Sequence, residues 1–69
     1  MSYEEMVQKT REAITEKEEG VGAEEIQIMW TGNAMNITKV IAYCAPHLYI
    51  VTMDRETDAV ACEKYVREA

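Results

Sequence analysis

Cys44, His47 and Cys62 are the residues of this 69-residue chain whose side chains suit metal binding or nucleophilic attack. Cys44 and His47 have the spacing of half a zinc site, which Cys62 and a carboxylate would have to complete. They also suggest a thiolate–base pair, but two groups on one tight turn rarely align with oxyanion donors. A single histidine and two thiols therefore predict neither a metal site nor a catalytic residue.

The acidic residues and the glycines add no catalytic or cofactor motif. Carboxylates occur as neighbours, as in Glu4-Glu5 and Glu24-Glu25, and adjacent residues of a helix point in different directions. The three glycines match neither the dinucleotide-binding fingerprint nor the phosphate-binding P-loop. We therefore expect no cofactor and a protein that is not an enzyme.

The charge balance indicates which partners the chain attracts. Thirteen acidic and seven basic residues give a formal net charge of −6, which disfavours contact with nucleic-acid phosphates and anionic lipids. Trp30 and the tyrosines would stack on bases only if basic residues lay among them, and Lys39 is the one base near Trp30. We expect no direct binding to nucleic acid and no membrane contact.

The start of the chain bears on localisation. Residues 1–5 lack the basic and apolar segments of a secretion signal. No apolar run approaches the ~20 residues of a membrane-spanning helix. We therefore expect a cytoplasmic protein whose two cysteines are reduced thiols.

Formal charge divides the chain into three parts. Residues 1–25 hold eight acids and three bases, residues 26–53 hold Lys39 alone, and residues 54–69 hold five acids and three bases. A chain of this length forms one domain, residues 1–69, with a small core. A nearly uncharged middle segment is therefore expected between two amphipathic ends.

The first amphipathic segment is predicted to form a helix. Ser2 followed by Glu5 has capping-box spacing, and Gly20 suits the left-handed residue that ends a helix. A stripe at three- and four-residue steps marks its inner face: Tyr3, Met6, Val7, Thr10, Ala13, Ile14 and Lys17.

The uncharged middle segment is predicted to form three strands. Ile26, Ile28 and Trp30 recur at every second position, and Gly32-Asn33 suits a two-residue hairpin turn. Residues 35–44 are rich in β-branched side chains and precede a proline, which favours a strand, although their spacing also fits a helix. Residues 48–53 are the third strand, after a turn at residues 45–47.

Residues 54–69 are predicted to form a closing helix, with Asp54 or Thr57 as its N-cap. Its inward stripe comprises Ala59, Cys62, Val66 and Ala69. The predicted fold is therefore α+β, a three-stranded antiparallel meander with an N-terminal and a C-terminal helix packed on one face.

This order of elements resembles the later half of roadblock domains, the dynein light chain-like family. The pattern of residues 25–28, 48–54 and 64–69 carries the resemblance, and no specific motif does. The resemblance implies a dimer that serves as a scaffold or regulator of small GTPases and motors. That family has no catalytic signature, so the resemblance implies no site residue.

The third predicted strand is apolar on both sides. Leu48 and Ile50 point one way and Tyr49, Val51 and Met53 the other, and such a strand is normally buried on both sides. If both helices cover one face, either a partner covers the second face or its apolar residues are scattered surface residues. We expect a small interaction module, an adaptor or regulator that binds a second copy of itself or a larger protein. The predicted interface residues are Trp30, Tyr43, Tyr49, Val51 and Met53.

Two other functions remain open at this stage. An acidic helix face could mimic nucleic acid and inhibit a nucleic-acid-binding enzyme, and its residues are Glu4, Glu5, Glu12, Glu16 and Glu19. A ligand-binding or enzymatic role at a dimer seam would depend on Cys44, His47 and Cys62.

Overall fold

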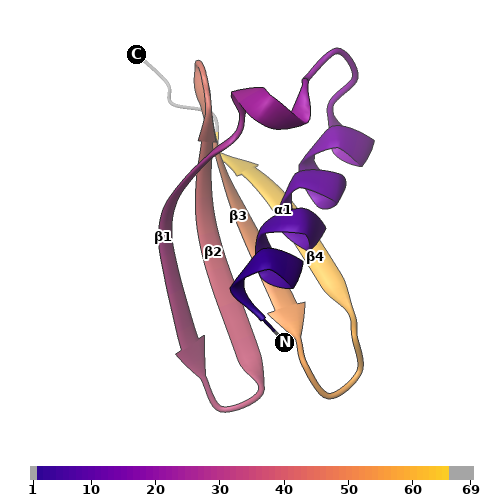
Figure 1. The fold of residues 1–69 in the computed structure, drawn as a ribbon, viewed down its shortest axis with the longest axis vertical. Helices are drawn as coiled ribbons and strands as arrows, with labels where there is room; N and C mark the ends of the chain where they lie inside the picture. The colour runs from indigo at the N-terminus through magenta and orange to yellow at the C-terminus, as the bar shows by residue number, and fades with distance from the viewer. Residues whose placement is uncertain (1, 66–69) are drawn as a thin grey trace.

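An α-helix lies on one face of a four-stranded antiparallel sheet in the computed structural model, which describes residues 2–65 (Figure 1). The sheet has the order β1-β2-β3-β4, so each strand pairs with its neighbour in the sequence. The elements of the described residues are α1 (Tyr3–Lys17), the 3₁₀ helix η1 (Ala23–Glu25), β1 (Gln27–Ala34), β2 (Ile37–Cys44), β3 (His47–Asp54) and β4 (Val60–Tyr65). No helix within residues 2–65 has the length and apolar character needed to cross a membrane.

The predicted N-terminal helix is confirmed as α1. Ser2 caps it, because the backbone N–H of Glu5 donates to Ser2 Oγ at 3.2 Å. The helix ends where the N–H of Glu18 donates to the carbonyl of Ile14, and Gly20 follows in the left-handed region with φ of 85°. Local capping chemistry thus fixes both ends of α1.

The first hairpin has its turn three residues later than predicted. Gly32 and Asn33 lie inside β1, and the turn falls at Met35-Asn36, with Met35 at φ of 55°. Asn33 stays in the strand because its Oδ1 accepts a hydrogen bond from Thr38 Oγ1 across the hairpin at 2.6 Å. The strand interpretation of residues 35–44 is confirmed for Ile37–Cys44. The third predicted strand is confirmed as β3, which follows a turn at residues 45–46.

The predicted closing helix is wrong, and with it the three-stranded, two-helix fold. Val60–Tyr65 form the strand β4, which pairs with β3 and satisfies the backbone groups along its otherwise free edge. The strand period also fits its environment, since Cys62 and Lys64 are half-buried while Ala61, Glu63 and Tyr65 are exposed. Val66 and Ala69, which were assigned to the same helix, lie outside the described residues.

Asp54 acts as a cap, but of a turn rather than of a helix. Its Oδ1 accepts the backbone N–H groups of Glu56 at 2.9 Å and Thr57 at 3.3 Å. Asp58 then takes a left-handed conformation, φ 61°, and Thr57 Oγ1 accepts the N–H of Ala59. The residues that predicted a helix start therefore build the β3–β4 turn.

The core lies between α1 and the sheet. Figure 1 shows α1 lying over β3 and β4, and contacts join it to both strands. Thr10 is buried and donates its hydroxyl to the carbonyl of Met6 at 2.8 Å, so it adds no unpaired polar group. The buried apolar residues are Met6, Ile14, Ile26, Val40, Ala42, Cys44, Tyr49, Val51 and Met53.

Candidate functional site

The face of the sheet that points away from α1 carries apolar residues from all four strands. Strand register puts Trp30, Ile41 and Ile50 in one row across β1, β2 and β3. A second row joins residues 43, 48 and 65 across β2, β3 and β4. We call this surface the open face; its apolar residues are Trp30, Ala34, Ile37, Ile41, Tyr43, Leu48, Ile50, Ala61 and Tyr65.

No element among residues 2–65 covers the open face. All of its apolar residues are exposed or half-buried, whereas their strand neighbours toward α1, such as Val40 and Val51, are fully buried. Trp30 keeps 52% of its surface exposed and Tyr65 keeps 57%. An antiparallel sheet with one solvated face normally carries mostly polar residues there, whereas apolar residues outnumber polar and charged ones on the open face.

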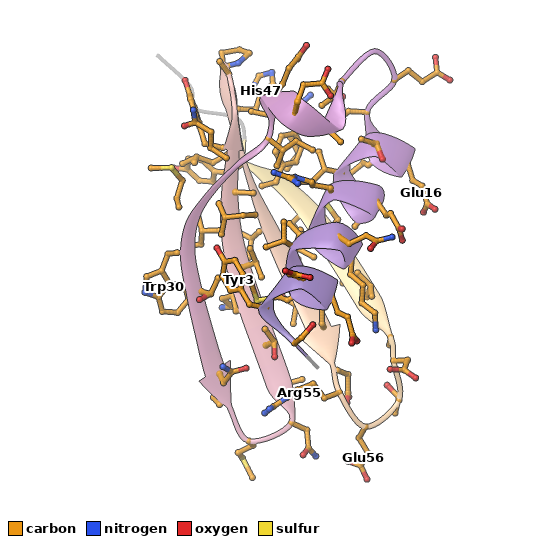
Figure 2. The ribbon with its side chains drawn as sticks, viewed as in Figure 1. Tyr3, Glu16, Trp30, His47, Arg55 and Glu56 are labelled. Atoms are coloured by element: carbon orange, nitrogen blue, oxygen red, sulfur yellow. The ribbon has the colours of Figure 1, made fainter. Side chains whose placement is uncertain are left out.

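A β-bulge turns Trp30 onto the open face. The register shifts between Ile28 and Trp30, so Ile28 pairs with Ala42 on the helix side while Trp30 pairs with Ile41 on the open side. Met29 is the extra residue of the bulge. Figure 2 shows the indole of Trp30 lying beyond β1, remote from α1. The regular alternation of Ile26, Ile28 and Trp30 therefore does not continue through the strand.

The absence of a side chain at Gly32 makes room for the indole. A Cβ atom at Gly32 would lie 2.3 Å from Cη2 of Trp30, which is far below any normal contact. Beside this pair, a hollow of about 560 Å³ opens at the β1–β2 turn end of the face. Trp30, Ala34, Ile37 and Lys39 contribute to its lining.

The structure does not bring the five predicted interface residues onto one surface. Trp30 and Tyr43 lie on the open face. Tyr49, Val51 and Met53 point toward α1, and each is at most 2% exposed. The alternation along β3 predicts that neighbouring residues face opposite sides of the sheet. Only the position of α1 decides which of the two sets is buried.

Seven apolar residues of the open face were not among the predicted interface residues, and four of them lie in its two rows: Ile41, Leu48, Ile50 and Tyr65. The first three belong to strands that the sequence predicted, and alternation with the buried set is the signal that identifies them. Tyr65 belongs to the segment that was predicted to be a helix, so no sequence signal put it beside Leu48.

The structure places Cys44 and His47 opposite each other and puts Cys62 on a different strand. Cys44 is buried and pairs in register with His47 across the β2–β3 hairpin, while Cys62 lies on β4 opposite Val51. Among the described residues, no three histidine, cysteine or acidic side chains gather as metal ligands do. Burial raises the pKa of Cys62, with Lys17 lowering it and Glu18 raising it further. A thiol with a raised pKa stays protonated at neutral pH, whereas the thiol of an activated nucleophile has a lowered pKa and forms a thiolate.

The acidic helix face contains basic residues as well. The predicted residues are all exposed: Glu4, Glu5, Glu12, Glu16 and Glu19. Glu19 lies beyond the end of α1 and so is not part of the helix face. Gln8 donates to Glu12 at 3.1 Å, and Lys9 lies 3.8 Å from Asp58. Two bases, Lys9 and Arg11, lie among the acids of α1, whereas Lys17 Nζ donates to the carbonyl of Cys62 on β4 at 3.0 Å. The surface is therefore mixed in charge rather than a continuous row of carboxylates.

Comparisons of the chain with protein-family models, with curated proteins and with solved structures each found no match. The resemblance to roadblock domains therefore stays a prediction. The geometry of the open face is the basis for assigning a function.

Proposed function

We propose that the chain is a small non-enzymatic interaction module that docks a protein partner on its open face, as an adaptor or regulator. The observation that supports this proposal is the apolar row of Trp30, Ile41 and Ile50, which no described residue covers. Large exposed apolar patches on small proteins mark sites of interaction. The aromatic residues of this face are of the types that dominate binding energy at interfaces.

The composition of the open face favours a protein over other partners. Among the described residues, its charged side chains are those of Lys39, Asp54 and Glu63. One base among two acids supplies no cluster for phosphate groups of nucleic acid or lipid. Depletion of charge around aromatic anchors is typical of the core of a protein interface.

The acidic inhibitor is the less favoured alternative. A nucleic-acid mimic needs carboxylates that repeat without opposing charges, whereas Lys9 and Arg11 lie among the acids of α1. Reversing the charge at Glu12 and Glu16 to lysine would leave docking on the open face unchanged. Under the inhibitor hypothesis the same reversal would abolish binding to a basic partner.

Photo-crosslinking tests the proposed surface in the cells that make the protein. Tyr65→p-benzoylphenylalanine places the crosslinker on the open face, and Tyr3→p-benzoylphenylalanine is the matched control, because Tyr3 is similarly exposed, at 64%, on α1. We expect a defined crosslinked product, identified by mass, from position 65 and not from position 3. Adding Ile50→Glu should remove that product. Equal crosslinking from both positions, or none from position 65, would contradict the proposal.

A further inference from the structure

We propose that the partner on the open face is a second copy of this chain, bound face to face about a two-fold axis that lies between the two sheets. This inference rests on the proposed docking function and specifies its occupant. Charge, size and shape complementarity each support it.

The distribution of charge favours this arrangement of two like molecules. Residues 2–25, which form α1, η1 and the turn between them, hold eight acids and three bases, so they carry a charge of 3 − 8 = −5 out of a total of −6. Face-to-face pairing puts these acidic layers on the two outer sides. With about 10 Å between packed layers, the helices would lie roughly 30 Å apart, beyond the ~8 Å screening length of physiological salt. Self-association through the helix layers would instead bring both acidic layers together.

The open face has the size that such a dimer needs. Four strands about 4.8 Å apart and up to eight residues long give a projected area of roughly 500 Å². Stable interfaces bury about 600–1000 Å² of accessible surface on each partner, and projecting side chains make the accessible area larger than the projection. The whole open face therefore corresponds to one interface, and an identical face covers it completely.

The two ends of the open face are complementary in shape. The hollow of about 560 Å³ lies at the end where Ala34 and Ile37 flank the β1–β2 turn. The aromatic row containing Tyr65 lies at the other end of the sheet, toward its opposite edge. A two-fold axis that lies between the sheets, passes near Ile41 and Ile50 and runs across the diagonal that joins these two ends places Tyr65 of each copy over the hollow of the other. Both contacts then form at once, as an isologous interface requires.

Sedimentation equilibrium of the purified chain tests the inference, with the fluorescence of its single tryptophan as a second readout. We expect a dimer at about 10 μM with Trp30 shielded from acrylamide. Tyr65→Ser should weaken dimerisation by about tenfold or more, because aromatic anchors carry much of the binding energy. Tyr3→Ser should leave it unchanged. Because Tyr65 is exposed, Tyr65→Ser should keep the fold. This variant therefore tests the dimer even if the more disruptive Ile50→Glu prevents folding.

A second pair of variants tests the two-fold seating. Ala34→Trp fills the hollow and should weaken the dimer about as much as Tyr65→Ser, while Ala45→Trp, at an exposed turn position off the open face, should have no effect. A dimer that tolerates Ala34→Trp, or that Tyr3→Ser weakens equally, would overturn the proposed arrangement.

The failure of this inference differs from the failure of the docking function. A wild-type chain that stays monomeric at about 100 μM overturns the second copy as occupant. If position 65 then still crosslinks to a different protein in cells, the docking function stands alone. If neither assay shows an occupied open face, both proposals are wrong.

Discussion

The indole of Trp30 lies directly over Gly32, two residues along the same strand, so a Cβ atom at Gly32 would stand 2.3 Å from Cη2 and 2.8 Å from Cζ2 of the ring. Both atoms belong to the far end of a half-exposed side chain. The indole is therefore able to swing away when the space over Gly32 is filled. The glycine sets the orientation of the largest aromatic residue on the open face.

Gly32→Ala should reorient Trp30 while preserving the fold. The added methyl group displaces the ring, so the emission maximum and acrylamide quenching of Trp30 should change. The free energy of unfolding in urea should change by less than about 1 kcal/mol, because alanine is better tolerated than glycine in a strand interior. Gly22→Ala is the control, since a Cβ there would meet only the exposed Glu24 carboxylate. Unchanged Trp30 fluorescence in Gly32→Ala would contradict this account of the pair.

Ile14→Ala should destabilise the protein strongly. Ile14 is fully buried between α1 and the sheet, and truncation leaves a cavity that costs about 2–5 kcal/mol. Val7→Ala, on the same helix at a half-buried position, should cost clearly less. Urea unfolding followed by circular dichroism measures both values. Equal losses would show that α1 is not anchored at Ile14.

Stability should fall as the pH rises above about 9, because Cys62, Tyr49 and Lys64 hold their protons more tightly in the folded chain. Burial, with Glu18 adding to it, raises the pKa of Tyr49 above the ordinary 10.0. A hydrogen bond from Lys64 to Glu18 at 3.0 Å raises the pKa of Lys64 above 10.5. Each stabilising contribution is complete below the unfolded-state pKa and disappears as the pH passes through the folded-state value.

The measurement is the urea midpoint at several pH values between about 8 and 11. Tyr49→Phe and Lys64→Met should each make the alkaline loss of stability less steep. Lys39→Met removes a lysine from the open face, away from Glu18, and serves as the control. If all three variants follow the wild-type pH profile, the raised pKa values of Tyr49 and Lys64 do not control alkaline stability.

Asp54→Ala should weaken the β3–β4 hairpin. The substitution removes the acceptor for the N–H groups of Glu56 and Thr57, at a cost of about 1–2 kcal/mol. Asp58→Asn is the matched control, since asparagine tolerates the left-handed conformation and only an exposed contact to Lys9 is lost. Faster amide exchange in β4 of Asp54→Ala, and not of Asp58→Asn, is the expected result. Similar exchange in both variants would mean that the turn does not depend on the Asp54 carboxylate.

Features with strong local signals could be predicted from the sequence. The capping residue Ser2 and the stripe that contains Met6 and Ile14 defined α1, because a helix depends on contacts within four residues. The strands β2 and β3 followed from β-branched residues around the turn at Pro46. An apolar second face of the sheet was also anticipated, from the alternation along β3.

Features that depend on pairing between distant residues could not be predicted. Ala59 and Cys62 fit a helical stripe. Only the pairing of Val60–Tyr65 with β3 makes that segment a strand. The bulge at Met29 reverses the direction of Trp30 without any marker in the sequence. The prediction of Tyr49, Val51 and Met53 as interface residues is wrong, because α1 covers their side of the sheet.

The sequential strand order has a consequence for how the molecule forms. Each strand pairs with the one before it, and a short turn joins the two. Most backbone hydrogen bonds of the sheet therefore require only the closure of short loops. Low contact order of this kind accompanies fast folding. The contacts of α1 with β3 and β4 span the greatest separation along the chain, so they should form after the hairpins of the sheet.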